Sequence, residues 1–195
     1  MKLEMHPDLR ATAARACRPD GALWVFGYGS LMWAPGFEAA EMRPARLYGY
    51  HRRFRLHSLM AWGSPERPGL CATLHHGGSV AGRGLLLRPK GQGAALTELG
   101  RREAAYLPRL VRIHIGRSGG DADWQPALTF VFNPDHPRAA HGLDIAQSVA
   151  LIRQGQGSSG RSHDYLRRVV EELHRDGTRD RAAEHLLRAA DKKPL

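Results

Sequence analysis

The chain has 195 residues, of which 42% are hydrophobic and 25% charged, and its formal net charge is +10. These values are ordinary for a soluble globular protein and allow one domain with a real core. No window approaches the 18 apolar residues of a membrane span, and residues 1–21 lack the apolar centre of a secretory signal. Cys17 and Cys71 alone do not make a disulfide framework, so we expect a cytoplasmic protein without membrane association.

The excess positive charge is compatible with nucleic acid or with a small anionic substrate. Most of it comes from single arginines, and the densest runs are pairs such as Arg52-Arg53 and Arg101-Arg102. The sequence has no RNA-recognition signature, no zinc-finger spacing and no lysine-rich tail. We therefore expect no nucleic-acid partner, and a basic nucleic-acid-binding protein stays a third alternative for the function.

The first half of the chain is predicted to consist mainly of strands. Residues 1–22 are predicted to be an N-terminal extension with a short helix over 9–16, and residues 23–195 one domain. Apolar runs and alternating patterns predict strands over residues 23–26, 47–58, 70–74 and 84–87. Glycine, proline and serine predict the turns between them, at residues 63–65, 68–69 and 75–78.

Helical periodicity becomes more frequent in the second half. A helix is predicted over residues 94–107, ended by Pro108. Strands at 110–115 and 127–133 follow, joined by a polar loop at 116–123. Two further helices are predicted over 144–154 and 164–175, the latter closed by Gly177, and Thr178 is expected to cap a terminal helix with Leu186 and Leu187. Strands followed by helices predict an α+β fold with a mainly antiparallel sheet or barrel.

Glu103 is the most informative residue of the helix predicted over 94–107. At 100° per residue, Leu96, Leu99, Glu103 and Leu107 fall within roughly 80° of one another, while Arg102 falls on the opposite flank. A carboxylate within an apolar stripe would be desolvated, and desolvation raises its pKa toward the range of a useful base. The alternative is a structural glutamate that pairs with a buried arginine.

The stretch VFGYGSLMW, residues 25–33, combines two glycines with an apolar run. It is not a dinucleotide fingerprint, because Met32 stands where a third glycine or alanine is needed. It is not a serine nucleophile elbow either, because Tyr28 and Met32 flank Ser30 in place of glycines. What remains is a short backbone turn whose N–H groups would hold a carboxylate or a developing oxyanion. The alternative is a plain turn at a strand end, with Tyr28 and Trp33 in the core.

Two stretches together identify a family resemblance. Residues 26–33, FGYGSLMW, paired with residues 102–106, REAAY, resemble the ChaC-type γ-glutamylcyclotransferases. Supporting stretches are GYHRRF at 49–54, GSPERPGL at 63–70 and GRSHDYL at 160–166. The resemblance extends over about residues 23–190, in the order that the family shows. Ala104 and Ala105 depart from it, since glycine is often seen there before the tyrosine.

The resemblance implies a cyclotransferase fold, a small mainly antiparallel or mixed β-barrel flanked by helices. It implies cleavage of the γ-glutamyl amide of glutathione to 5-oxoproline and cysteinylglycine, without a metal or cofactor. By the same resemblance Tyr28, Gly29, Ser30 and Leu31 bind the γ-glutamyl group, and Glu103 is the catalytic base. The histidines agree with the absence of a metal, because their spacing does not join them to Asp, Glu or Cys in a ligand cluster.

The chemistry of this reaction fits the residues found. The substrate's own α-amine attacks its γ-carbonyl to close a lactam, and one carboxylate can both remove the proton and return it to the departing amine. Tyr28, Tyr106 and Tyr165 are candidate hydrogen-bond partners of the substrate, although each also suits a core aromatic. Other γ-glutamyl amines are an alternative substrate class, and a non-catalytic module for anionic ligands is an alternative function. A monomer or a homodimer is expected.

Overall fold

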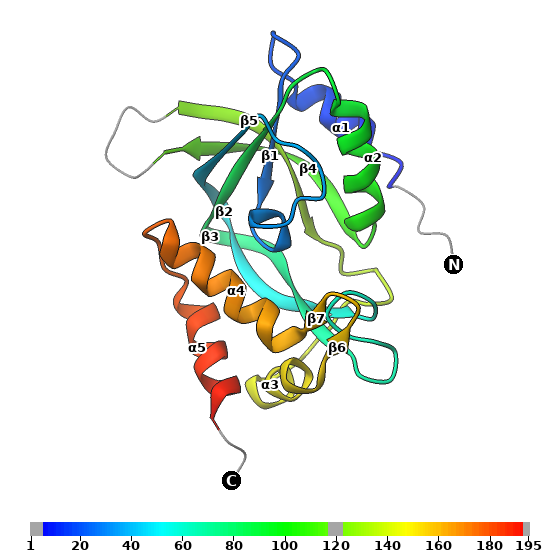
Figure 1. Ribbon diagram of the computed structural model, residues 1–195, viewed down its shortest axis with the longest axis vertical. Helices are drawn as coiled ribbons and strands as arrows, with labels where there is room; N and C mark the ends of the chain where they lie inside the picture. The colour runs from blue at the N-terminus through cyan, green and yellow to red at the C-terminus, as the bar shows by residue number, and fades with distance from the viewer. Residues whose placement is uncertain (1–5, 117–122, 193–195) are drawn as a thin grey trace. The chain divides into compact units, whose positions relative to one another are not determined.

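The computed structural model describes residues 6–116 and 123–192 of the chain (Figure 1). Within these residues, the long strands form a closed barrel in the order β1-β3-β2-β4-β5. Strand β1 pairs antiparallel with β3 and parallel with β5, while β4 pairs antiparallel with both β2 and β5. The predicted α+β fold with a mainly antiparallel barrel is therefore confirmed. The strands span β1 (Leu23–Gly27), β2 (Glu41–Ser58), β3 (Gly69–Leu87), β4 (Tyr106–Ile115) and β5 (Asp123–Phe132).

The described part of the chain folds into two compact units. The first comprises residues up to 51 together with those from 76 to 133, and the second comprises residues 52–75 with those from 134 onward. Strands β2 and β3 each contribute residues to both units. The boundary predicted at residue 22 stays a prediction.

The first unit holds the helices α1 (Leu9–Ala16) and α2 (Gln92–Arg102) beside strands of the barrel (Figure 1). Helix α1 has the bounds predicted for it, and it buries Leu9, Ala13 and Ala16. These residues recur at helical spacing, so they form one apolar face, and α1 packs against β4 and β5. Strand β1 is buried along its whole length, as its continuous apolar sequence predicts.

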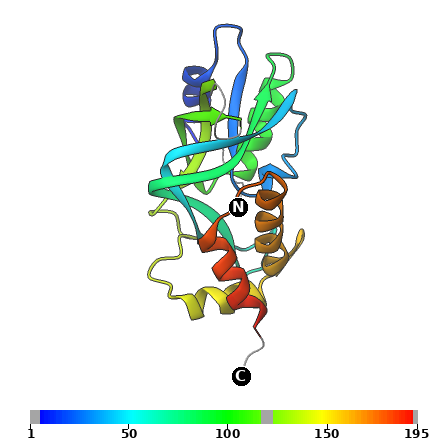
Figure 2. The same ribbon diagram turned by 90° about the vertical axis from the view of Figure 1, so that its left-hand side faces the viewer.

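The second unit holds three helices, α3 (Ile145–Gln154), α4 (Ser162–Arg175) and α5 (Arg181–Asp191), and a short hairpin of β6 (Gln156–Gly157) and β7 (Gly160–Arg161). The three helices pack against one another, and Figure 2 shows α4 and α5 side by side. A reciprocal pair of hydrogen bonds between Asp144 and Gln147 caps the start of α3. The three helices predicted for this region are confirmed.

The predicted cap of the last helix is wrong. Asp180, not Thr178, accepts the hydrogen bond from the backbone N–H of Ala183 and begins α5. Thr178 instead serves the end of α4, because its N–H and its hydroxyl both donate to the carbonyl of Leu173. Gly177 closes α4 as predicted, with a positive φ of 71° that suits glycine.

Strand β2 does not keep one face along its length. Before Gly49 the buried positions are Ala45 and Leu47, and after it they are Arg52, Phe54 and further even-numbered residues. Gly49 has a φ of +81°, and a glycine in this conformation forms a bulge that shifts the alternation by one residue. Tyr48 is consequently 51% exposed and does not share the side of Phe54, contrary to the prediction.

Strand β3 is one continuous strand where two were predicted. The histidines and glycines at residues 75–78 lie inside it and do not form the predicted turn. Gly77 and Gly78 both have positive φ, so they bend the strand without ending it. The bend lies beside that of β2, because the carbonyl of Gly77 is 3.1 Å from His51 Nδ1.

Helix α2 is shorter than predicted, and the strand after it is longer. The helix ends at Arg102, and a turn over residues 103–105 leads into β4 at Tyr106. Pro108 does not end a helix but pairs with Phe130 inside the β4–β5 ladder. Strand β5 begins at Asp123, before the predicted start at 127. The predicted loop at 116–123 lies largely outside the described residues.

Candidate functional site

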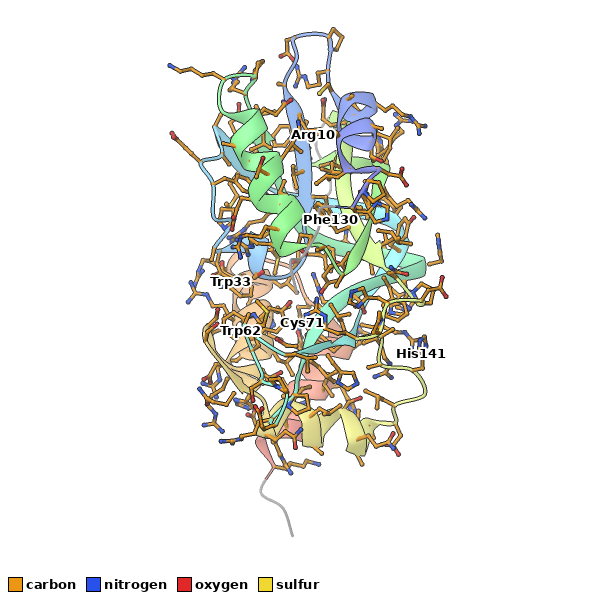
Figure 3. The ribbon with its side chains drawn as sticks, turned by 90° about the vertical axis from the view of Figure 1, so that its right-hand side faces the viewer. Arg10, Trp33, Trp62, Cys71, Phe130 and His141 are labelled. Carbon is orange, nitrogen blue, oxygen red and sulfur yellow. The ribbon has the colours of Figure 1, made fainter. Side chains whose placement is uncertain are left out.

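The turn after β1 is a short 3-10 helix, η1 (Ser30–Met32), followed by Trp33 and Ala34. The hydrogen bonds of this segment are made within the turn. The N–H of Met32 donates to the carbonyl of Gly29, and the N–H groups of Trp33 and Ala34 both donate to the carbonyl of Ser30. Figure 3 labels Trp33 at the end of this segment. We call residues 28–34 the η1 loop.

Glycine is needed at residue 27 because of packing, since its φ is not positive. A Cβ at Gly27 would lie 2.7 Å from Cβ of Leu31 and 3.3 Å from Cδ1 of Leu85. Leu31 itself is buried. The η1 loop therefore folds back directly onto the end of β1, and only a residue without a side chain fits beneath it.

The start of the η1 loop offers backbone donors. Among the described residues, none accepts a hydrogen bond from the N–H groups of Gly29, Ser30 or Leu31. The first N–H groups of a helical turn have no partner within the turn, and they suit a carboxylate or an oxyanion. This geometry supports the predicted anion-binding turn.

Two arginines from other elements hold the η1 loop. Arg102, the last residue of α2, donates from Nη1 to the carbonyl of Ala34 at 2.6 Å and from Nη2 to Oγ of Ser30 at 3.0 Å. Arg83 of β3 donates from Nη1 to the carbonyl of Met32 at 2.5 Å. Two guanidinium groups thus place positive charge at the loop, which favours an anionic ligand.

Sequence reasoning missed both arginines as parts of the site. Arg83 was one of many dispersed arginines, and Arg102 was placed on the flank of its helix opposite Glu103. The signal that would have found Arg102 is its position immediately before Glu103 in the REAAY stretch.

Glu103 lies just beyond the end of α2. Its N–H donates to the carbonyl of Leu99 at 2.8 Å, its carbonyl accepts from the N–H of Tyr106 at 2.9 Å, and the residue is half-buried. The predicted place in the middle of an apolar helical stripe is wrong, because the helix ends one residue earlier. One link between Glu103 and the η1 loop is the neighbouring residue Arg102, whose side chain contacts that loop.

Two of the three candidate tyrosines belong to the same unit as the η1 loop. Tyr28 is buried, and its hydroxyl donates to the carbonyl of Phe130 at 2.7 Å; Figure 3 labels Phe130 on β5. Pro108, which pairs with Phe130, has no N–H to donate. The carbonyl of Phe130 therefore cannot receive a hydrogen bond from Pro108, and the Tyr28 hydroxyl serves as its donor. Tyr106 is also buried, at the start of β4.

Tyr165 belongs to the second unit, on α4. Its hydroxyl accepts from the N–H of Ala72 at 3.2 Å. Its ring centroid lies 5.2 Å from that of Trp62, which is labelled in Figure 3, and 6.3 Å from that of Phe54. Within its own unit, Tyr165 thus has the contacts of a core aromatic whose hydroxyl is satisfied.

Neither a metal-ligand cluster nor a membrane-spanning helix is found among the described residues. The side chains in that part of the chain form no group of three or more His, Cys, Asp or Glu suited to a metal ion. Across the same residues, none of the helices combines the length and apolar character needed to span a membrane.

The site combines three features. It lies on a mixed barrel, it has a turn suited to an anion after the first strand, and it has the Arg102-Glu103 pair at the end of α2. These features are typical of a site that binds a small anionic substrate and transfers protons with a carboxylate. The model of the family described as ChaC-like protein matches residues 23–193. The chain therefore belongs to the ChaC-like family, and the resemblance found in the sequence is confirmed.

Relatives in distant organisms agree with this assignment. The chain is 33% identical over 179 residues to the glutathione-specific γ-glutamylcyclotransferase of Escherichia coli, covering 90% of this chain and 76% of that protein. It is 32% identical over 169 residues to the human glutathione-specific γ-glutamylcyclotransferase 1, covering 82% of this chain and 74% of the other.

A solved structure confirms the fold. The crystal structure of the yeast γ-glutamylcyclotransferase specific to glutathione matches with a TM-score of 0.79 and 19% identity. The match covers 87% of this chain and 96% of the yeast chain. The fold is therefore that of the γ-glutamylcyclotransferases, as expected from the sequence.

Proposed function

We propose that this protein is a γ-glutamylcyclotransferase that cleaves glutathione to 5-oxoproline and cysteinylglycine. The observation that carries the proposal is the link, within one unit of the fold, between the η1 loop and Glu103. Arg102 makes this link, because it precedes Glu103 and hydrogen-bonds to Ser30 and Ala34. The names of the relatives supply the substrate, since those of E. coli and human are called glutathione-specific.

Binding is assigned to the η1 loop. The N–H groups of Gly29, Ser30 and Leu31 donate to the carboxylate and the γ-carbonyl of the γ-glutamyl group, with Tyr28 forming part of the pocket. Fixed donors of this kind orient the substrate and stabilise negative charge that develops on the carbonyl oxygen. The nearby guanidinium groups of Arg83 and Arg102 add a favourable potential for the anion.

Glu103 is assigned the proton transfers. Its carboxylate removes a proton from the substrate's α-ammonium group, and the freed amine attacks the γ-carbonyl carbon. The new C–N bond closes the five-membered lactam. The attacking nitrogen still carries two protons at this point. As the amide C–N bond breaks, Glu103 gives the first proton to the departing nitrogen of cysteinylglycine. Glu103 then takes the second proton from the ring nitrogen, which leaves the neutral lactam, and passes it to the released amine, which departs as an ammonium group. One general acid-base group therefore serves both steps, and atoms and charges balance without a protein nucleophile.

The remaining assignments complete the proposal. Tyr106 and Tyr165 are proposed as further hydrogen-bond partners of the substrate, in a domain spanning residues 23–195 with an extension at 1–22. A monomer or a homodimer is proposed, acting in the cytoplasm without nucleic acid as a partner. Neither Cys17 nor Cys71 forms a disulfide bond within the described residues, which suits a reducing compartment.

The test compares three proteins for release of 5-oxoproline from glutathione. The native protein is expected to be active, and Glu103→Gln is expected to lose about 10²–10⁴-fold in kcat while its urea unfolding midpoint changes little. Glu171→Gln, which removes an exposed carboxylate from α4, is the matched control and keeps its activity. Substantial turnover by Glu103→Gln would contradict the assignment of the base.

Two alternatives are separated by the same assay. Turnover of other γ-glutamyl amines faster than glutathione would assign the protein to the broader substrate class. Binding of glutathione without any release of 5-oxoproline by the native protein would indicate the non-catalytic module.

A further inference from the structure

We propose that Arg102 is a positioning residue that couples substrate binding to the catalytic base. It orients the Ser30 hydroxyl toward the substrate carboxylate and holds the end of α2, and so Glu103, against the η1 loop. The inference rests on the proposed function and deepens it. Arg102 itself touches no reacting atom in this scheme.

The first step concerns the direction of the Ser30 hydroxyl. Oγ of Ser30 accepts from Nη2 of Arg102 at 3.0 Å, and no other described group bonds to this oxygen. A hydroxyl that accepts from a cation turns its own proton away from that cation, and the donor strength of its O–H increases. The hydroxyl proton of Ser30 is thus available to an anionic acceptor at the start of the η1 loop, beside the N–H groups of residues 29–31.

The second step concerns the two ends of the η1 loop. One guanidinium group contacts the side chain of Ser30 and, through Nη1, the carbonyl of Ala34 at 2.6 Å. The planar fork of arginine can serve two such acceptors at once, whereas a lysine ammonium is a single point charge. Arg102 therefore ties the first and the last part of the loop to the same helix end.

The third step concerns the residues that surround the guanidinium group of Arg102. Gly36 has a φ of +79°, and a Cβ at this residue would lie 2.8 Å from Nη1 of Arg102. A side chain there would displace the guanidinium group. Arg101 donates to both carboxylate oxygens of Glu98, at 3.0 and 2.7 Å. These hydrogen bonds lower the pKa of Glu98, and the charge of Arg102 also helps to lower it, but the hydrogen bonds of Arg102 are made with the η1 loop.

The consequence for Glu103 follows from the chain. Glu103 follows the last residue of α2, and its backbone hydrogen bonds to Leu99 and Tyr106 make it move with the end of the helix. Its peptide bond joins it to Arg102, whose side chain is fixed on the η1 loop. A shift of about 1 Å in a catalytic group can cost about 10²-fold in rate, so loss of this tie affects kcat as well as KM.

The experiment compares Arg102→Met with Arg101→Met in release of 5-oxoproline from glutathione. Both variants remove one arginine from the last turn of α2, but only Arg102 contacts the η1 loop. We expect kcat/KM to fall by about 10–100-fold for Arg102→Met and by less than about 2-fold for Arg101→Met. Arg102→Lys is expected to recover part of the loss, because it can reach one of the two acceptors.

A double-mutant cycle with Ser30→Ala separates positioning from mere stability. Ser30→Ala alone is expected to raise KM with little change in kcat. When Ser30→Ala is added to Arg102→Met, kcat/KM is expected to change by less than about 2-fold further. The Ser30 hydroxyl has already lost the hydrogen bond from Arg102 that orients it. Effects that multiply in the double variant would overturn the proposed coupling, as would equal activities of Arg102→Met and Arg101→Met. All assays are made at a temperature where urea titration shows every variant folded.

Failure of the inference is distinguishable from failure of the proposed function. If the native protein releases no 5-oxoproline, the function fails, whatever the variants do. If the native protein is active and Arg102→Met behaves as Arg101→Met does, only the role of Arg102 is overturned.

Discussion

The packing of the η1 loop onto Gly27 makes Gly27→Ala a sharp test of how the loop is held. The new Cβ would lie 2.7 Å from Cβ of Leu31, where ordinary contact begins near 3.4 Å. The loop backbone at Leu31 must therefore move, because a Cβ atom is not the flexible end of a side chain. Overpacking of this kind costs about 1–3 kcal/mol. The smaller entropy of alanine in the unfolded chain offsets about 0.4–1 kcal/mol of that cost.

The net loss is at most about 2.6 kcal/mol, with a central value of about 1.3 kcal/mol, and the central value lowers Tm by about 3–5 °C for a chain of this size. Gly93→Ala is the control, because Gly93 lies in α2 with nothing within 4 Å of its added Cβ, and alanine there stabilises by up to about 1 kcal/mol. Urea unfolding followed by tryptophan fluorescence measures both variants, and glutathione turnover measures KM. A Gly27→Ala protein as stable as Gly93→Ala, with an unchanged KM, would refute the reasoning.

Two further variants test single contacts. Tyr28→Phe removes the donor to the buried carbonyl of Phe130 and is expected to lower the free energy of unfolding by about 1–3 kcal/mol; an unchanged urea midpoint would contradict this. Hydrogen bonds from Arg179 and His174 lower the pKa of Glu184 from 4.5 to about 2, so its stabilisation is complete above pH 4.5 and is lost as the pH falls toward 2. The stability difference between native protein and Glu184→Gln should therefore shrink in urea titrations from pH 5 to pH 3, and a difference that grows on acidification would exclude this account.

Elements whose pattern is purely local were predictable from the sequence. Helix α1 has the bounds predicted for it, and in the structure its apolar face consists of Leu9, Ala13 and Ala16. Strand β1 and helix α3 also lie where the pattern placed them, within one residue at either end.

Elements that depend on a neighbouring strand were not predictable in the same way. The positive φ of Gly49 reverses the alternation of β2, and the glycines at 77 and 78 bend β3 without ending it. A glycine that makes a bulge and one that makes a turn have the same local sequence signature. Pro108 was misinterpreted for a related reason, since a proline inside a ladder and one after a helix both interrupt a pattern.

The candidate site shows the same division between local and long-range information. Residues 28–31 were recognisable because they are contiguous. The role of Arg102 was not, because its partner Ser30 lies 72 positions away in the chain. No periodicity relates two such residues. The pairing of β1 with β3, the strand that leads into α2, is a long-range feature of the fold that places these elements side by side.

Glu103 was singled out by a structural premise that the fold overturns, and this changes the physical argument for it. A base in the middle of a buried helical face would be positioned by the packing of its own helix. A base just beyond the helix end depends on further contacts as well. Among them are the backbone hydrogen bonds of Glu103 with Leu99 and Tyr106, and the hydrogen bonds of the neighbouring Arg102 side chain to the η1 loop. The η1 loop and Glu103 are then connected through the hydrogen bonds of Arg102. A change that loosens the loop should therefore also displace Glu103. The Arg-Glu dipeptide, rather than the glutamate alone, is the functional unit that this geometry supports.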